Sequence, residues 1–596
     1  MRRGFLSCAL VAALLAGAPL SWAQDQASDA VAPEARSDAP APSPALPPAA
    51  APVRAERQMV TAAHPLAAEA GLAILRAGGS AIDATVAVQL VLGLVEPQSS
   101  GIGGGAFLVY FDAAGGRLTT FDGRETAPRA ATPKLFLDEA GEPLEFYDAV
   151  VGGRSVGTPG TVKLLAETHA RYGKLPWADV VAPAIELAEA GFAVSPRLAR
   201  LIAEDGDRLK RFETTRAYFF DNEGRPLAAG HRLKNPQYAA TLRRIAERGA
   251  AGFYEGPVAE DIVRTVTQAP NNPGLLSLED LRAYRIAERE PVCTDYRGHE
   301  VCGMGPPSSG ALTVGQILEL IEPFDVKAMA PLAPETWRLI GDASRLAFAD
   351  RGRYMADIDF VPMPLKGLLD ESYMAERAKL LGGPRALPDD AVTPGEPPWD
   401  HAMRLGDDAA IELPSTTHFN VVDASGNVVS MTTTIENGFG SRLMTGGFLL
   451  NNELTDFSFE THENGYPVAN RVEPGKRPRS SMAPTIVMRE GRPVLAIGSP
   501  GGSRIIGFVA QSLIAWIDWG MDPQAAISMP RFGNRFGAFD VEAGTPGEAA
   551  AEGLRSLGYE TVEAIAPDSG LHAIAITPNG LLGGADPRRE GVAVGD

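Results

Sequence analysis

The chain has 596 residues, of which 45% are hydrophobic and 21% charged, so it is long enough to bury a large core. Its formal net charge of −20 argues against nucleic acid or an anionic membrane surface as a partner. The scattered histidines and cysteines show no metal-ligand spacing, so we predict neither a metal nor another cofactor.

The N-terminus has the pattern of an export signal. Arg2 and Arg3 are followed by an apolar run and then by a small-x-small motif that ends at Ala23. We therefore expect a signal peptide at residues 1–23 and a periplasmic or secreted protein. An uncleaved anchor is the lesser alternative, because the run is short for a membrane span. Residues 24–56 are rich in Ala, Pro, Ser and Asp and should form a disordered or partly extended linker.

Helical and strand patterns alternate between residues 57 and 415. Apolar residues recur with helical spacing at 64–79 and 183–194, whereas 106–113 and 117–123 have the composition of strands. Beyond residue 416 strands dominate first, and a helix follows near residues 508–520. This mixture of helices and antiparallel hairpins is typical of a layered protein.

Two glycine-containing stretches imitate motifs of other enzyme classes. Residues 101–106 resemble a dinucleotide-binding fingerprint, but a helix is predicted before them and a strand after them, which reverses the required order. Residues 153–157 fit the G-x-S-x-G motif, so a serine hydrolase with Ser155 as nucleophile and His572 as base is a distant alternative.

Cys293 and Cys302 flank a predicted two-residue turn at Arg297 and Gly298. In such a hairpin they lie directly opposite each other, where cross-strand side chains approach most closely. An oxidising compartment favours a disulfide between them, and two reduced cysteines in a strand pair are the other interpretation. The pattern alone leaves both open.

Thr416 opens a predicted β-hairpin directly after a long polar, Pro-rich stretch. Strands rich in Val and Thr at residues 416–422 and 428–436 flank the turn signal DASGN. A turn centred on Ser425 places Thr416 opposite Thr434, and a one-residue bulge would shift this pairing by one position. Either register surrounds Thr416 with hydroxyl groups.

Cleavage of the Ser415–Thr416 bond would give Thr416 a free α-amine beside its own hydroxyl. An α-amine with a pKa of about 8 is a usable general base, so one residue would supply both nucleophile and base. The alternative is that Thr-rich strands are common because β-branched residues suit sheets. Farther along, Gly501 and Gly502 follow an apolar strand and either point backbone N–H groups at an oxyanion or form an ordinary turn.

A series of further segments stands in order along the chain: TAAHPLAAEAGLAILRAGGSAIDA, SSGIGGGAF, FDGRETAP, PPSSG, TTHFNVVD, NNELTDF, RPRSSMAPT and GSPGGSRI. Together they closely resemble the γ-glutamyltransferase family of N-terminal nucleophile hydrolases. The resemblance implies an α+β fold, a four-layer αββα sandwich with two stacked antiparallel sheets between helical layers. It also implies a precursor that cuts itself before Thr416. The large subunit, residues 57–415, and the small subunit, residues 416–596, would form one domain.

The resemblance assigns a role to each site residue. It implies that Thr416 is the nucleophile and base, that Thr434 supports it, and that Gly501 and Gly502 form the oxyanion hole. The residues expected to bind the substrate are Arg124, Ser480 and Ser481 at its α-carboxylate, and Glu453, Asp456 and Glu436 at its α-ammonium. The chemistry agrees, because an arginine offers a carboxylate two parallel hydrogen-bond donors that lysine cannot reproduce.

The implied activity is that of a γ-glutamyltransferase and glutathione hydrolase. A γ-glutamyl group from glutathione or a similar compound would pass through an ester on Thr416 to water or to the amine of an amino acid or dipeptide. A glutaryl-type (cephalosporin) acylase of the same superfamily is the alternative, and its substrate lacks the α-ammonium. A binding protein that captures γ-glutamyl compounds without cleaving them is more distant. The sequence leaves open whether residues 457–479 form a lid over the site.

Overall fold

The computed structural model of the chain describes residues 50–408, 410 and 412–596. The predicted signal peptide at 1–23, and the predicted linker as far as residue 49, lie outside the described residues. Within these ranges no helix is both long enough and apolar enough to cross a membrane.

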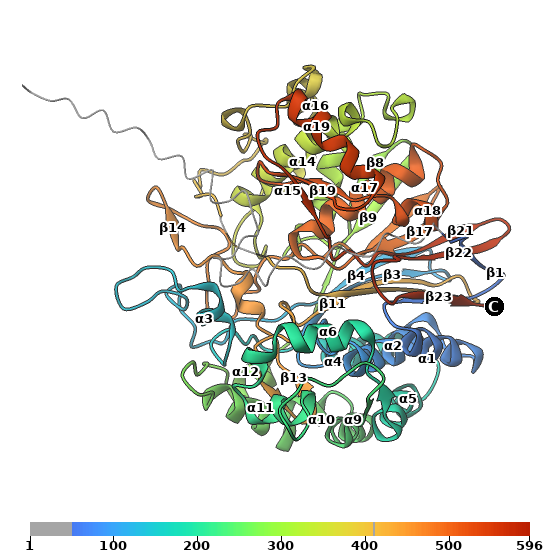
Figure 1. The fold of residues 1–596 in the computed structure, drawn as a ribbon, viewed down its shortest axis with the longest axis vertical. Helices are drawn as coiled ribbons and strands as arrows, with labels where there is room; N and C mark the ends of the chain where they lie inside the picture. The colour runs from blue at the N-terminus through green and yellow to red at the C-terminus, as the bar shows by residue number, and fades with distance from the viewer. Residues whose placement is uncertain (1–49, 409, 411) are drawn as a thin grey trace, which may run out of the picture.

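Two seven-stranded antiparallel sheets form the centre of the fold (Figure 1). The first has the order β23 (Val592–Gly595), β2 (Met59–Ala62), β10 (Thr417–Val422), β11 (Val428–Thr434), β3 (Gly105–Asp112), β4 (Arg117–Gly123) and β7 (Ala287–Arg289). The second has the order β1 (Val53–Ala55), β22 (Gly580–Ala585), β21 (His572–Thr577), β17 (Arg492–Gly498), β16 (Thr485–Arg489), β9 (His299–Gly303) and β8 (Val292–Tyr296).

Smaller strands lie outside these two sheets. One three-stranded sheet contains β18 (Phe532–Asn534), β19 (Phe539–Glu542) and β20 (Val562–Ile565). The short pairs are β5 (Phe192–Ala193) with β6 (Arg232–Leu233), β12 (Met444–Thr445) with β13 (Phe448–Leu449), and β14 (His462–Glu463) with β15 (Tyr466–Pro467).

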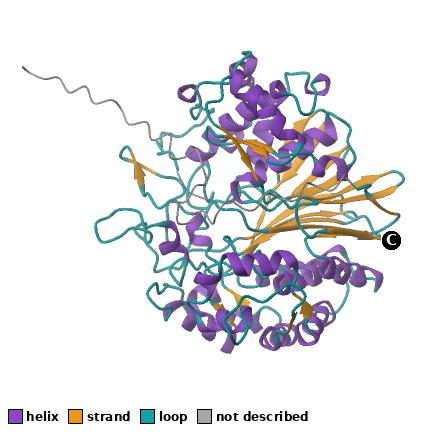
Figure 2. Ribbon diagram, in the orientation of Figure 1, coloured by secondary structure: helices purple, strands orange, loops and turns teal. Residues whose placement is uncertain are grey.

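Helices cover the outer face of each large sheet, which gives four layers in the order αββα (Figures 1 and 2). The helices on the side of the first sheet, which share one apolar core with it, are α1 (Pro65–Arg76), α2 (Ala81–Val95), α3 (Phe146–Val150), α4 (Thr161–Tyr172), α5 (Trp177–Ala190), α6 (Pro196–Glu204), α7 (Gly206–Leu209), α8 (Glu213–Phe219), α9 (Pro236–Arg248), α10 (Ala251–Tyr254), α11 (Pro257–Thr267) and α12 (Leu278–Ala283). Those on the second are α13 (Gly310–Ile321), α14 (Pro334–Tyr354), α15 (Leu365–Leu368), α16 (Glu371–Ala378), α17 (Ile505–Ile517), α18 (Pro523–Ser528) and α19 (Ala551–Leu557). The predicted α+β sandwich is confirmed.

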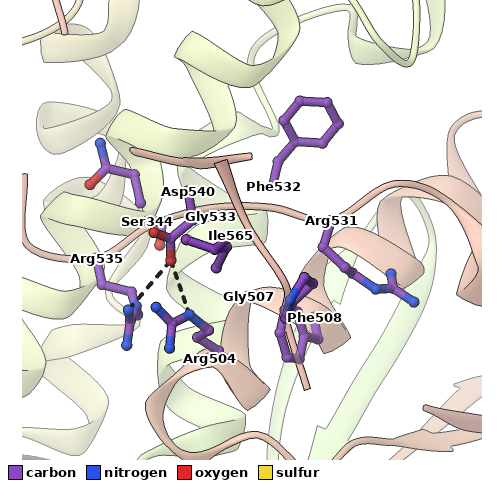
Figure 3. A pocket seen from close by; sticks show the side chains of 12 residues that line it. Ser344, Arg504, Gly507, Phe508, Arg531, Phe532, Gly533, Arg535, Asp540 and Ile565 are labelled. Carbon is purple, nitrogen blue, oxygen red and sulfur yellow. Dashed lines mark hydrogen bonds and ion pairs between the residues drawn. The ribbon is translucent and has the colours of Figure 1, made fainter. Parts of the chain in front are cut away.

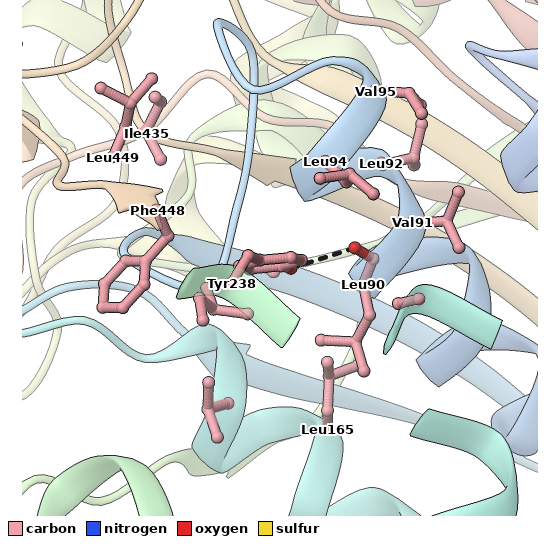
Figure 4. Close-up of a cluster of buried hydrophobic side chains, with 14 of the residues drawn as sticks. Leu90, Val91, Leu92, Leu94, Val95, Leu165, Tyr238, Ile435, Phe448 and Leu449 are labelled. Atoms are coloured by element: carbon pink, nitrogen blue, oxygen red, sulfur yellow. Dashed lines mark hydrogen bonds between the residues drawn. The ribbon is translucent and has the colours of Figure 1, made fainter. Parts of the chain in front are cut away.

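The helix α2 shows how the sequence builds one outer layer. All of its side chains are buried, because it lies between the first sheet and the other helices, and an apolar surface all round suits that position. Ser80 and Asp83 form a capping box at its start. Tyr238 of α9 packs beside it and donates a hydrogen bond of 3.0 Å to the Leu90 carbonyl (Figure 4). The buried Tyr238 hydroxyl therefore has a hydrogen-bond partner.

Strand pairing joins the segments before and after Thr416. In the first sheet β10 pairs with β2, and β11 with β3; in the second, β16 pairs with β9, and β22 with β1. A cut before Thr416 therefore leaves two pieces that share both sheets. Residues 53–55 fall in the predicted linker but form β1. An edge strand is held by backbone hydrogen bonds, so it does not need the apolar alternation that sequence reading looks for.

Candidate active site

The hairpin that carries Thr416 has the register predicted from its turn. Thr417 pairs with Thr433 and Val422 with Val428, and no shift interrupts the ladder. The turn is held by Asp423, whose carboxylate accepts the backbone N–H of Ser425 at 2.8 Å. The next position along the ladder therefore places Thr416 beside Thr434.

The two threonine hydroxyls meet at the end of this hairpin. The Oγ1 atoms of Thr416 and Thr434 lie 3.2 Å apart, and the Thr434 hydroxyl also accepts the backbone N–H of Glu436 at 2.8 Å. This fixes the side chain of Thr434 against Thr416.

The backbone around Thr416 is under strain and tightly held. Its φ of 76° lies in the left-handed region, where a β-branched residue is a genuine outlier that costs about 1–3 kcal/mol. The buried guanidinium of Arg589 donates to the Thr416 carbonyl at 2.9 Å. The carbonyl of the preceding residue, Ser415, accepts the N–H of Gly501 at 3.2 Å. A predicted oxyanion donor thus already points at the carbonyl of the bond expected to be cut.

A pocket opens in front of Thr416 and collects most of the residues predicted for the site. We call it the Thr416 pocket. The predicted residues that line it are Arg124, Thr416, Thr434, Glu436, Glu453, Asp456, Ser480, Ser481 and Gly502. The sequence reasoning missed four others, namely Glu412, Leu413, Met482 and Ile505. Gly501 reaches the site through its backbone N–H instead.

Arg124 is fully buried and is paired inside the protein. Its guanidinium forms ion pairs with Glu453 and, at 2.5 Å, with Asp456, and it also donates to the backbone carbonyls of Pro478 at 3.2 Å and Arg479 at 2.8 Å. Burial alone would lower the pKa of Arg124, but the two carboxylates beside it raise that pKa. The predicted carboxylate binder and the predicted ammonium binders therefore neutralise one another.

Acidic side chains outnumber Arg124 in this corner of the pocket. Glu436, Glu453 and Asp456 are all buried, and so is Glu125, which lies next to Glu453 and had no role in the sequence reasoning. Burial, and then repulsion by neighbouring carboxylates, holds the pKa of Glu436 well above its ordinary value. Within the described part of the chain, Glu453 Oε2 and Asp456 Oδ1 have no hydrogen-bond partner. These acceptors suit an ammonium group.

The two predicted serines also line the Thr416 pocket. The Ser480 hydroxyl accepts the N–H of Met482 at 3.1 Å. The Ser481 hydroxyl donates to the Glu412 carboxylate at 2.5 Å and accepts a bond of 2.7 Å from Arg351. Glu412 precedes Thr416 by four residues in the uncut chain, and neither it nor Arg351 had been predicted. Arg351 lies in the last turn of α14, a helix whose sequence gives no sign of a site.

The serine-hydrolase alternative finds no support in the geometry. Ser155 is completely buried, and its hydroxyl donates to the Val150 carbonyl at 2.7 Å. No hydrogen bond joins it to His572, whose two ring nitrogens lack partners among the described residues. The stretch at 101–106 follows α2 and runs into β3, which is the helix-to-strand order that argued against a dinucleotide site.

Other predicted features are placed as follows. Cys293 and Cys302 lie opposite each other in β8 and β9, and a disulfide joins them. No residue of 457–479 lines the Thr416 pocket; part of this segment forms the β14–β15 hairpin. No group of three or more His, Cys, Asp or Glu within the described ranges could hold a metal ion.

A second pocket is lined by residues of α17 and of the three-stranded sheet β18–β19–β20 (Figure 3). Asp540 sits between two arginines there, 3.0 Å from Nε of Arg504 and 3.6 Å from Nη2 of Arg535. None of the predicted site residues lines it. The predicted site residues therefore gather at the Thr416 pocket and not at this one.

Comparison with known proteins agrees with the resemblance seen in the sequence motifs. The family model for gamma-glutamyltranspeptidase matches residues 67–596. The glutathione hydrolase proenzyme of Bacillus subtilis (strain 168) is 37% identical over 548 residues, 90% of this chain and 91% of the relative. The acylase ACY 1 proenzyme of Pseudomonas sp. (strain V22) is 37% identical over 541 residues, 90% of this chain and 92% of the relative. A solved cephalosporin acylase from Bacillus halodurans has a TM-score of 0.79 at 29% identity, and the match covers 92% of this chain and 98% of that one.

Proposed function

The chain belongs to the gamma-glutamyltranspeptidase family, and from this membership we propose that Thr416 is both the point of self-cleavage and the catalytic nucleophile. The enzyme is a γ-glutamyltransferase and glutathione hydrolase that is made as a proenzyme. One observation carries the proposal: Thr416 Oγ1 lies 3.2 Å from Thr434 Oγ1, while the preceding carbonyl, on Ser415, accepts the N–H of Gly501.

Self-cleavage begins with attack by Thr416 Oγ1 on the carbonyl carbon of Ser415. The negative charge that develops on the Ser415 oxygen is stabilised by the N–H of Gly501. The C–N bond then breaks, the amine of Thr416 takes up the hydroxyl proton, and an ester is left. Water hydrolyses this ester and restores the Thr416 hydroxyl. Strain in the Thr416 backbone raises the energy of the intact bond and so favours the reaction.

Turnover uses the same oxygen with a new base. The free α-amine of mature Thr416 accepts the proton of its own hydroxyl, and Oγ1 attacks the γ-carbonyl of the donor. The N–H groups of Gly501 and Gly502 stabilise the oxyanion. The leaving amine takes the proton, and water or the amine of an amino acid or dipeptide then resolves the γ-glutamyl ester.

Recognition of the donor follows from the paired charges in the pocket. The α-carbon of a γ-glutamyl group carries one carboxylate and one ammonium. Such a zwitterion can replace the internal pairs of Arg124 with Glu453 and Asp456, with its carboxylate on the guanidinium and its ammonium on the acids. Glu436 supplies a further carboxylate for the ammonium, and Ser480 and Ser481 further donors for the carboxylate.

The excess of acids favours a γ-glutamyl donor over a glutaryl one. The relatives named as acylases keep the acylase alternative open. A glutaryl group lacks the ammonium, so it would leave Glu436, Glu453 and Asp456 with no cation beyond Arg124, which would also have to bind the substrate's carboxylate. Initial rates with γ-glutamyl anilide and glutaryl anilide separate the two activities, and we expect the γ-glutamyl compound to react faster.

We further propose how the mature enzyme is assembled and where it works. Residues 57–415 and 416–596 stay together as large and small subunits, because strands of one segment pair with strands of the other in both sheets. The predicted signal peptide directs export to the periplasm or the medium. Glutathione or another γ-glutamyl compound is the donor there.

Substitution of the nucleophile tests this proposal. Thr416→Ala should remain a single chain on a denaturing gel and should not release anilide from the γ-glutamyl donor. Thr417→Ala is a matched control, because the Thr417 hydroxyl donates instead to Glu96, at 3.0 Å, and its loss should allow cleavage. Cleavage of Thr416→Ala at the same bond would show that another residue performs it.

A further inference from the structure

The uncut chain places a carboxylate of its own in the Thr416 pocket. Glu412 is buried, and its carboxylate binds the hydroxyl of Ser481 at 2.5 Å and forms an ion pair with Arg351. Burial alone would raise the pKa of Glu412, but Arg351 and Arg479 lower it, so the group is held as an anion. Its partner Ser481 is one of the serines proposed to bind the substrate's α-carboxylate.

Arg351 is built to bind an anion at this position. It lies near the end of α14 and is buried, and its Nε donates to Ser309 at 2.7 Å. Its Nη2 is directed to Glu412 and, at 2.7 Å, to Ser481. Glu412 lines the Thr416 pocket, whereas Arg351 does not. A buried guanidinium needs an anion beside it, so another carboxylate is favoured when Glu412 is withdrawn.

The segment that carries Glu412 has to leave before a donor can react. A side-chain carbon added at Gly502 would lie only 2.6 Å from the Leu413 carbonyl and 2.7 Å from that of Glu412. The segment therefore fills the space against one of the proposed oxyanion donors. Cleavage at Ser415–Thr416 removes its covalent link to β10 and permits that movement.

We propose that Arg351 and Ser481 form an anion site that Glu412 fills in the uncut chain and that the donor's α-carboxylate fills after cleavage. Glu412 thus acts as a built-in substitute for substrate, and Arg351 is a specificity residue of the mature enzyme in addition to Arg124. This inference rests on the proposed function, since it assumes a γ-glutamyl donor.

The test compares two donors in mature Arg351→Lys. One is γ-glutamyl anilide; the other is 4-aminobutanoyl anilide, which keeps the ammonium but lacks the α-carboxylate. We expect kcat/KM to fall by about tenfold or more with the first donor and by less than about threefold with the second. Arg353→Lys is the matched control, because Arg353 lies on the same helix and binds Asp407 of the same segment, at 2.7 Å, outside the pocket. Arg353→Lys should leave kcat/KM unchanged with both donors.

Equal losses with both donors, or no loss with either, would overturn the inference. Wild-type turnover of γ-glutamyl anilide reports separately on the proposed function, so the two can fail independently. If Arg351→Lys does not mature, or the second donor reacts too slowly to measure, mature Glu412→Gln decides. The cut segment of this variant should compete less well for Arg351, so its KM for γ-glutamyl anilide should fall below that of wild type. Mature Glu396→Gln, changed at an exposed position of the same stretch that does not line the pocket, should keep the wild-type KM. An unchanged KM in Glu412→Gln would refute the site.

Discussion

Replacement of Arg124 by lysine probes the proposed recognition of the donor most closely. The guanidinium reaches two carboxylates and two backbone carbonyls at once, through all three of its nitrogens. A lysine keeps the positive charge but has one nitrogen, which cannot span Glu453 and Asp456 and also present two parallel donors to a carboxylate.

The expected loss can be estimated from these contacts. A hydrogen bond to a charged group typically contributes about 1.5–3 kcal/mol, and Arg124→Lys removes at least one such bond to the α-carboxylate. That range corresponds to a fall in kcat/KM of roughly ten- to a hundredfold. Self-cleavage should continue, because Arg124 makes no contact with the Ser415–Thr416 bond in the hydrogen bonds described.

The assay is kcat/KM with γ-glutamyl anilide and with glutaryl anilide, measured on enzyme whose cleavage is complete. Glutaryl anilide retains the carboxylate, so Arg124→Lys should reduce its turnover by a similar factor. Arg345→Lys provides the control: this arginine is also buried and paired, with Asp342 at 3.2 Å, but it lies outside the Thr416 pocket. An Arg124→Lys enzyme that matures fully and keeps wild-type kcat/KM would show that Arg124 does not bind the carboxylate.

Three further predictions concern stability and proton balance. The Cys293–Cys302 disulfide closes a short loop, so Cys302→Ser should lower the free energy of unfolding by about 2–3 kcal/mol in urea titrations; an unchanged midpoint would refute this. Burial lowers the pKa of His418 to about 3 and that of His572 to about 4, from 6.5. Protonation of either histidine therefore favours the unfolded state, and the stability that each neutral ring contributes is complete above pH ~6.5. Between pH ~6.5 and about pH 5, wild type should lose about 2 kcal/mol more stability than His572→Asn, a comparison in which the opposite pH dependence of buried acids such as Glu436 cancels; equal losses in the two proteins would contradict it. Burial raises the pKa of Glu436, so binding of L-glutamate should release protons and should become tighter as pH rises. Glu436→Gln should release fewer protons than wild type, and calorimetry in two buffers of different ionisation enthalpy would measure the difference. Equal proton release by the two proteins would count against Glu436.

Local signals in the sequence were enough to predict the hairpin at the centre of the site. The turn DASGN fixes the register of β10 and β11, because a short turn with Asp423 at its start leaves few alternatives. The order of strands in the two sheets could not be obtained this way. It depends on pairs such as β2 with β10, whose partners are separated by more than three hundred residues, and no local pattern encodes such a pairing.

The sequence identified the residues that carry distinctive motifs and missed those that do not. Arg124, Thr416 and Gly501 stand in recognisable segments, and the structure brings them to one place. Arg351 and Glu412 were missed because each occupies an ordinary context, a long amphipathic helix in one case and a polar connecting stretch in the other. Their contact exists only once α14 and the segment before Thr416 are packed together.

The identity of the acylated residue is the most direct test of the central claim. Purified enzyme would be mixed briefly with a γ-glutamyl donor, quenched in acid, digested and analysed by mass spectrometry. We expect a peptide that begins at Thr416, with no residue attached before it, and a fraction of that peptide should carry one base-labile γ-glutamyl group. A label on another residue, or an active enzyme in which Ser415 and Thr416 are still joined, would contradict it.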